Sequence, residues 1–232
     1  MKYLVYGIVP EVPRRPGRLP KGIGGRPVSR IAAQGLAASC SRVNGRLATP
    51  NVAQVAAFAR VVAALHARGP VLPMRYGCVF ETKAQAVEFL EKRRARFLAA
   101  LGELEGCCEM GIRVLLRGRE AKGSPPAPAP VAGAAYLAGR ASFYAARDGA
   151  HEDARGASRT IRRALRGRFV GCRVERSSVG AGRLLSLFFL IRQSDEEAFR
   201  RAFHTLQQRE DRKLLLTGPW PPYNFVPCEK AE

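Results

Sequence analysis

A proline-dense stretch near the middle of the chain divides the sequence into two parts. Residues 118–131 (GREAKGSPPAPAPV) hold four prolines and show no apolar periodicity. Proline fixes φ and has no amide proton, so this stretch suits neither a helix interior nor a central strand and is expected to be an extended spacer. We therefore predict two domains, over residues 1–117 and 132–217, joined by a linker over 118–131.

Length and composition allow both parts to bury a core. The chain has 232 residues, of which 47% are hydrophobic and 25% are charged, as in soluble globular proteins. The longest mainly apolar run, Leu184–Ile191, is well short of the ~18 residues that a transmembrane helix needs. Since no secretory signal is visible at the N-terminus either, we expect a cytoplasmic protein without a membrane span.

Hydrophobic periodicity predicts alternating strands and helices in both parts. The first part shows strands over 2–9, 29–43, 71–80 and 110–116, with one helix after Thr49-Pro50 and another after Thr82. The second part shows a helix over 154–165, strands over 170–174 and 184–191, a helix after Ser194 and a last strand over 213–217. This order favours the α+β class, with each domain a ferredoxin-like antiparallel sheet covered by helices.

The charge suggests either an acidic partner or no more than an arginine-rich composition on solvated faces. Lys and Arg number 39 and Asp and Glu 19, a formal net charge of +20, and cations concentrate in residues 10–46 and 155–176. Such patches attract phosphate, anionic lipid or acidic protein surfaces. An RNA-binding sheet would also need paired aromatic side chains on one face of a central strand. Phe188 and Phe189 are adjacent and point to opposite faces, which speaks against nucleic acid as a partner.

No motif of catalysis, cofactor binding or metal binding stands out. The six cysteines form no CxxC pair and are expected to be reduced, and the three histidines lie far apart. Gly22-x-Gly24-Gly25 lacks the Lys-Ser/Thr of a phosphate loop. Glu105 and Glu109 bracket a predicted turn and are interpreted as solvated charges. We therefore expect no enzymatic activity, no cofactor and no metal.

Two segments are too distinctive for a generic fold. One is the strand VLPMRYGCVF over 71–80, in which Pro73 restricts the strand to a sheet edge or a bulge. Its candidate interaction residues are Pro73, Arg75, Tyr76 and Gly77. The other is the tail, which the prolines are expected to keep out of the sheet as an extended segment over 218–232. Its candidates are Gly218, Pro219, Trp220, Pro221, Pro222, Tyr223 and Phe225.

With the opening YLVYGIV and the segment Glu109–Val114, these motifs resemble the gas vesicle GvpF/GvpL family in sequence order, from Tyr3 to Val226. The resemblance leaves the F and L types open. It implies a two-domain α+β protein of the cytoplasm, associated with the gas vesicle shell, and brings no catalytic residues. The implied function is assembly factor and minor structural component. Its implied partners are the hydrophobic major shell protein, which it keeps from aggregating, and other gas vesicle accessory proteins.

Two other functions compete with this one. The first is an RNA-binding module on a ferredoxin-like sheet, suggested by the net charge. The second is a membrane-surface protein, for which residues 155–166 form a weak basic amphipathic candidate helix. For the tail we expect Trp220, Tyr223 and Phe225 to be buried against the protein itself, in the crease between the two domains, since exposed aromatic rings promote aggregation. The alternative is that these rings form an exposed aromatic hook for the shell protein.

Overall fold

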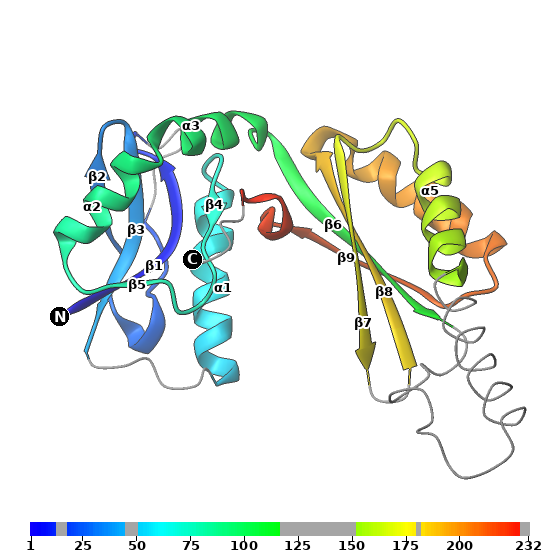
Figure 1. Ribbon diagram of the computed structural model, residues 1–232, viewed down its shortest axis with the longest axis horizontal. Coiled ribbons are helices and arrows are strands. Elements are labelled where there is room, and N and C mark those ends of the chain that lie inside the picture. Colours follow the sequence, from blue (N-terminus) through cyan, green and yellow to red (C-terminus); the bar gives the residue numbers. More distant parts are fainter. Residues whose placement is uncertain (13–17, 45–50, 117–151, 180–181, 228–232) are drawn as a thin grey trace, which may run out of the picture. The chain divides into compact units, whose positions relative to one another are not determined.

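A computed structural model describes residues 1–12, 18–44, 51–116, 152–179 and 182–227. The chain forms two compact units (Figure 1). Unit 1 comprises Met1–Glu109 together with Pro219–Glu232, and unit 2 comprises Met110–Gly218. Each contains an antiparallel sheet and helices, which confirms the α+β class. The predicted linker over 118–131 lies outside the described residues.

The sheet of unit 1 is centred on its first strand, which is buried over most of its length. Its strand order is β2-β3-β1-β4, with β5 also paired to β1, and all of these pairs are antiparallel. The strands are β1 (Lys2–Pro10), β2 (Ser29–Ala33), β3 (Leu36–Val43), β4 (Leu72–Pro73) and β5 (Val79–Phe80). This order of strands differs from the predicted ferredoxin-like arrangement of the first half.

The segment 29–43 is a hairpin, whereas the sequence predicted one strand. The chain reverses at Gln34 and Gly35, which have φ of 49° and 87°. Two successive residues with positive φ give the turn that matches the twist of a two-residue hairpin, and glycine accepts this conformation without strain. Alanines on both sides of the turn, at 32, 33, 37 and 38, hide the change of direction from a periodicity search.

Three helices flank this sheet: α1 (Val52–His66), α2 (Lys83–Lys92) and α3 (Arg94–Glu103). In Figure 1, α1 and α2 lie on opposite sides of the strands. The predicted N-cap of α1 at Thr49 lies outside the described residues, and the observed cap is Asn51, in a capping box with Gln54. The continuous helix predicted after Thr82 is interrupted at Arg93, which has non-helical φ and ψ.

A buried tyrosine organises the core between α1 and the sheet. The hydroxyl of Tyr6 donates to Ser41 Oγ at 3.0 Å and accepts from the amide of Ile23 at 2.9 Å. The Tyr6 ring packs against Phe58 of α1, with 5.0 Å between centroids. A Cβ atom at Gly22 would lie 2.0 Å from the Tyr6 hydroxyl oxygen, so only glycine fits at this position. The first glycine of the Gly22-x-Gly24-Gly25 segment is therefore a packing residue.

Unit 2 has a complete ferredoxin-like topology. Along the chain it runs β6 (Cys107–Leu116), a helix over 152–164, β7 (Gly171–Val179), β8 (Gly182–Arg192), α5 (Glu196–Arg209) and β9 (Leu214–Trp220). Its sheet order is β7-β8-β6-β9. The predicted boundary at residue 117 was wrong because it assigned β6 to the first domain. Hydrogen bonding to β8 and β9 places most of this strand in the second sheet instead.

Both helices of unit 2 cover the same face of its sheet (Figure 1). Alternate residues of β8 point into this core and are fully or almost fully buried: Leu185, Leu187, Phe189 and Ile191. The Phe189 ring lies between Phe169 and Phe199, with centroid distances of 5.1 and 5.4 Å. Within unit 2, no described helix lies over the opposite face of the sheet.

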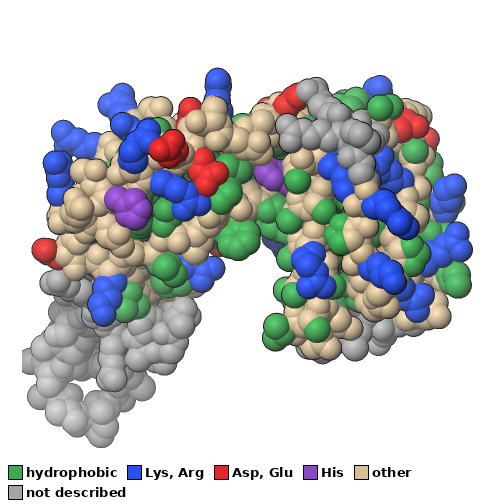
Figure 2. All heavy atoms as spheres, turned by 180° about the vertical axis from the view of Figure 1, so that it is seen from behind, with side chains coloured by type: hydrophobic (Ala, Val, Ile, Leu, Met, Phe, Trp, Pro, Cys, Tyr) green, Lys and Arg blue, Asp and Glu red, His purple; other side chains and the backbone are tan. Residues whose placement is uncertain are grey.

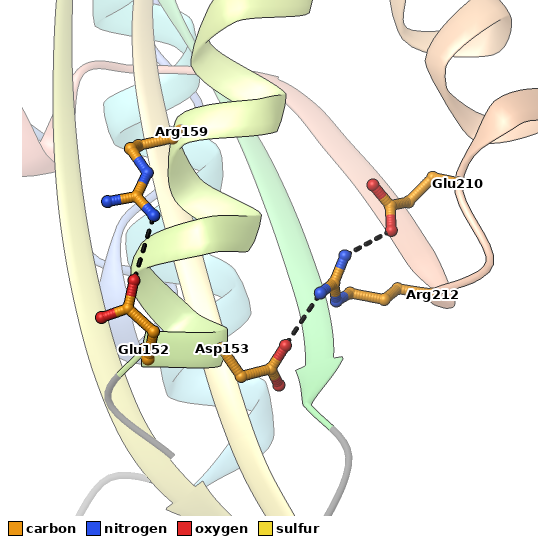
Figure 3. A network of polar contacts seen from close by, with 5 residues as sticks. All are labelled: Glu152, Asp153, Arg159, Glu210 and Arg212. Carbon is orange, nitrogen blue, oxygen red and sulfur yellow. Dashed lines mark hydrogen bonds and ion pairs between the residues drawn. The ribbon is translucent and has the colours of Figure 1, made fainter. Parts of the chain in front are cut away.

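Arg212 forms two ion pairs in unit 2 (Figure 3). Its guanidinium contacts Asp153, in the first turn of the helix over 152–164, at 2.8 Å, and Glu210, just after α5, at 2.6 Å. These hydrogen bonds raise the pKa of Arg212 further. Arg212 thus ties the start of one helix to the connection between α5 and β9.

Candidate interaction surface

The side of the unit 2 sheet that the two helices of this unit leave uncovered is a candidate interaction surface, and we call it the open sheet face. Cross-strand pairs Arg173–Phe188 and Glu175–Ser186 assign these residues of β7 and β8 to one face. A Cβ atom at Gly111 would lie 2.6 Å from Thr217 Oγ1 and 3.9 Å from Phe188, so β6 and β9 contribute to the same face. By strand alternation, further members on β6 and β9 include Glu109, Arg113, Leu115 and Leu215.

Two leucines on this face are exposed. Leu115 and Leu215 have 53% and 58% of their surface accessible, and they lie on the neighbouring strands β6 and β9. Two exposed leucines on neighbouring strands of one sheet face leave apolar surface there that a partner can cover. We call Leu115 and Leu215 the leucine patch.

The two phenylalanines of β8 lie as the sequence predicted. Phe189 is fully buried in the core, and Phe188 belongs to the open sheet face. The neighbouring central strand, β6, presents Gly111, Arg113 and Leu115 on this face and no aromatic residue. A sheet that stacks bases uses aromatic side chains on its two central strands, so the open sheet face does not fit the RNA-binding alternative.

The tail motif begins inside the sheet, contrary to the extended tail predicted from Gly218. Strand β9 continues through Gly218 and Pro219 to Trp220. This is possible because β9 is an edge strand, where a proline needs no ladder partner on its solvent side. Arg200 of α5 also donates from Nη2 to the Gly218 carbonyl at 2.8 Å.

The predicted burial of the tail aromatics was wrong for Trp220 and Tyr223. Trp220 is 52% exposed and Tyr223 39%, while Phe225 is half-buried. The prolines between them, Pro221 and Pro222, are the buried residues of this segment. The burial that the sequence predicted for the aromatic rings is therefore found for the two prolines, whose side chains lose little conformational entropy on burial.

A buried carboxylate anchors the turn after β9. Glu109 of β6 is only 4% exposed and accepts two hydrogen bonds from Asn224, one from the backbone amide at 2.8 Å and one from Nδ2 at 2.7 Å. Although 39% of the Tyr223 surface is exposed, desolvation of its hydroxyl group raises its pKa to about 12, and the charge of Glu109 adds to this shift. Glu109 is thus not the solvated charge that the sequence suggested. The available signal was its position between Cys108 and Met110 at the start of an apolar strand.

The other distinctive segment forms a sharp turn. Pro73 of β4 pairs with Gly7 of β1, and the chain re-enters the sheet at β5. Between them the Cys78 amide donates to the Arg75 carbonyl at 3.1 Å, and Gly77 has φ of 94°. The predicted single strand is therefore interrupted, because Pro73 ends the ladder and Gly77 permits the reversal.

The candidate side chains of this turn divide into packing and exposed groups. The Tyr76 ring lies 5.5 Å from Phe58, and its hydroxyl donates to Gln54 Oε1 at 3.4 Å. Pro73 is buried, whereas Arg75 and Gly77 are exposed. Pro73 and Tyr76 thus support the fold of unit 1, and Arg75 and Gly77 lie on its surface.

The residues suited to metals or nucleophilic chemistry are dispersed. Among the described residues no group of three His, Cys, Asp or Glu could hold a metal ion. Burial raises the pKa of the Cys78 thiol to about 11 and that of Cys40 as well, which keeps both protonated. The His66 ring nitrogen Nε2 donates to the Cys107 carbonyl at 2.9 Å, and burial lowers the His66 pKa. These groups serve packing and hydrogen bonding within unit 1.

Comparison with known proteins decides the family. The sequence model described as gas vesicle synthesis protein GvpL/GvpF matches residues 2–227. The chain belongs to this family. The resemblance drawn from the tail, the 71–80 segment and the opening strand is thereby confirmed. The family is one of gas vesicle structure and assembly and is not known for catalysis.

Relatives in the GvpL/GvpF family match this chain over nearly its whole length. Gas vesicle protein F of Streptomyces sp. (strain CB03234) is 29% identical over 243 residues, which cover 97% of this chain and 100% of the relative. Crystal structures of GvpF from Microcystis aeruginosa and Anabaena sp. PCC7120 superpose with TM-scores of 0.77 and 0.75, at 16% and 13% identity. Each match covers 98% of this chain and 99% of the GvpF chain, so this chain shares the fold of both crystal structures.

Family membership assigns the chain a role connected with gas vesicles, and other gas vesicle proteins are the corresponding class of partners. Within the described part of the chain, no helix combines the length and the apolar character needed to cross a bilayer.

Proposed function

We propose that this chain is a non-enzymatic assembly factor and minor structural protein that binds the hydrophobic major shell protein of the gas vesicle and keeps it from aggregating, as a cytoplasmic protein that becomes associated with the shell. The observation that carries the proposal is the leucine patch on the open sheet face. A shell protein that must present an apolar surface to gas would aggregate if that surface were free in water. An accessory protein with an exposed apolar face can cover it.

The open sheet face suits such a partner for two reasons. It is a rigid surface, since its strands are held from behind by the Phe189 core. It also ends at β7, an edge strand of nine residues that could add a strand of the partner by main-chain hydrogen bonds.

The test compares two double variants in suppression of shell-protein aggregation. Leu115→Thr with Leu215→Thr removes the leucine patch while keeping residues that favour strands. The control, Val52→Thr with Val170→Thr, changes two valines that are 87% and 60% exposed outside the open sheet face. Denatured shell protein is diluted into buffer containing each chain, and light scattering is followed.

Each leucine has about half its surface left to bury, which is about 1 kcal/mol per side chain. Because threonine keeps part of this, we expect the leucine variant to bind shell protein about tenfold more weakly. Wild type and control should suppress scattering equally. If wild type neither binds the shell protein nor delays its aggregation, the proposed function is wrong. Equal suppression by both variants would move the binding surface away from the leucine patch.

A further inference from the structure

The helix over 152–164 carries a row of arginines on one side. Arg155, Arg159, Arg162, Arg163 and Arg166 are all exposed, and we call them the arginine stripe. The last lies in the turn that continues the helix, where the Leu165 amide still donates to the Ile161 carbonyl at 3.1 Å. At 3.6 residues per turn the five positions fall within an arc of about 100°. The buried residues Ala154, Ala157, Ile161 and Leu165 occupy the opposite arc.

The carboxylates of this helix do not neutralise the stripe. Glu152 forms an ion pair with Arg159 of the stripe at 3.1 Å, whereas Asp153 forms its ion pair with Arg212, which lies outside the helix (Figure 3). Within the part of the chain that the structure describes, the other four arginines of the stripe form no ion pair: Arg155, Arg162, Arg163 and Arg166. The stripe therefore presents concentrated positive charge to solvent.

The second helix of the same unit shows that an arginine-rich composition alone does not explain this. On α5, Arg200 binds Glu196 at 2.8 Å and Arg201 binds Glu197 at 2.6 Å, each four residues apart. Figure 2 shows Lys and Arg side chains spread over the face it draws, with Asp and Glu gathered in fewer places. Arginines thus occur throughout the chain. Arg200 and Arg201, at the centre of α5, form ion pairs, whereas most arginines of the stripe do not.

The stripe also opposes the stability of its own helix. Arg155 and Arg159, Arg159 and Arg163, and Arg162 and Arg166 are like charges four residues apart, which destabilises a helix. Arg155 lies in the first turn, where the helix dipole disfavours a cation, although the dipole favours the arginines of the last turn. A negatively charged partner laid along the stripe would relieve this repulsion.

We propose that the arginine stripe binds a carboxylate-rich segment of the protein that this chain accompanies in vesicle assembly, an inference that rests on the proposed function. Guanidinium groups match carboxylates in a two-point geometry. Arginines four residues apart are separated by a rise of about 6 Å, the spacing of acidic residues four apart on a helix or two apart on a strand.

A protein segment fits the stripe better than single-stranded nucleic acid does. Nucleic-acid sites of that kind combine cations with exposed aromatic rings on which bases stack. The exposed positions of the described helix carry no aromatic side chain, and Phe169, just beyond it, is stacked against Phe189 in the core at 5.1 Å.

The test uses two triple variants of equal net charge. Arg155→Gln, Arg162→Gln and Arg166→Gln weaken the stripe and keep the Glu152–Arg159 pair. The control changes Arg60, Arg192 and Arg209, exposed arginines of other elements, to glutamine. Association rates are measured by surface-immobilised binding with three probes: the shell protein, a 12-residue glutamate-rich peptide and a 20-nucleotide RNA. Each is run in about 0.05 and about 0.5 M NaCl, because salt screens such attraction.

We expect the stripe variant to associate with shell protein and with peptide about tenfold more slowly than the control at low salt, and to lose most of its salt dependence. If wild type binds the shell protein and both variants match it, the stripe inference is overturned while the proposed function stands. If wild type binds the peptide through the stripe but not the shell protein, the proposed function fails and the chemistry of the stripe is upheld. Tighter binding of RNA than of peptide, lost in the stripe variant, would overturn the choice of a protein partner.

Discussion

The hydrogen bonds between Asn224 and Glu109 make a quantitative claim about stability. Replacing Asn224 by alanine removes the 2.7 Å bond from Nδ2 and leaves the backbone bond at 2.8 Å. A hydrogen bond to a charged group contributes about 1.5–3 kcal/mol. Because Glu109 is 4% exposed, water cannot readily replace the lost donor. We therefore expect Asn224→Ala to lower the free energy of unfolding of unit 1 by about 2–3 kcal/mol.

Urea unfolding followed by tryptophan fluorescence can measure this loss. Trp220 is the single tryptophan of the chain and lies four residues before Asn224, so its emission reports on this part of the molecule. With a slope of about 2–3 kcal/mol per molar urea, the midpoint should fall by about 1 M. Far-UV circular dichroism in the same titration follows both units together, since they can unfold in separate steps.

Two further variants guard the interpretation. Asn44→Ala changes an exposed asparagine and should alter stability by less than about 0.5 kcal/mol. Glu109→Gln keeps the shape of the acceptor but removes its charge, and combining it with Asn224→Ala completes a double-mutant cycle. If Asn224→Ala costs no more than Asn44→Ala, or if the cycle shows no coupling, then the carboxylate does not hold the turn and our reasoning on this site is refuted.

Three other outcomes follow from the packing. Trp220→Ala should cost about 2 kcal/mol, and acrylamide should quench native Trp220 readily, because the ring is 52% exposed; strong protection from quenching would contradict this. In thermal unfolding, Gly22→Ala should destabilise the protein by at least about 2 kcal/mol, because its Cβ would lie 2.0 Å from the Tyr6 hydroxyl. Gly156→Ala, which has open space in the helix over 152–164, should stabilise it by about 0.5–1 kcal/mol. A change of the same sign for both variants would be inconsistent with the structure. The pKa of Tyr223 rises from 10.0 to about 12 in the fold, so the stability that its neutral phenol contributes is present below pH 10 and lost between about pH 10 and 12. Tyr223→Phe should therefore flatten the fall of the unfolding free energy over this pH range. An unchanged fall would argue against desolvation of the hydroxyl group.

Local patterns predicted which residues form strands, but not which sheet a strand joins. Alternation identified residues 110–116 as a strand and placed Phe188 and Phe189 on opposite faces, both as observed. The assignment of β6 to the first domain failed because periodicity describes one strand and its two faces, while sheet membership depends on partners a hundred residues away. The boundary was predicted at residues 118–131 because the prolines there interrupt the apolar periodicity.

The candidate site was predictable only in part, for similar reasons. In the tail, the aromatic rings were predicted to be buried, whereas Pro221 and Pro222 are buried and Trp220 and Tyr223 are exposed, since whether a side chain is buried depends on what lies opposite. Glu109 was missed because its partner, Asn224, is 115 residues further along the chain. The open sheet face could not be found at all from the sequence, because the helix-free side of a sheet is a property of the assembled layers.

The division of the chain also constrains the order in which the protein can form during translation. Unit 2 is a continuous segment, Met110–Gly218, whereas unit 1 includes residues made after all of unit 2. Glu109 can therefore bind its partner Asn224 only after the ribosome has synthesised the whole of unit 2. Contacts between residues so far apart form slowly, and domains completed earlier fold as units on the nascent chain. The open sheet face and the arginine stripe can thus be ready for a partner before the turn that completes unit 1 has been synthesised.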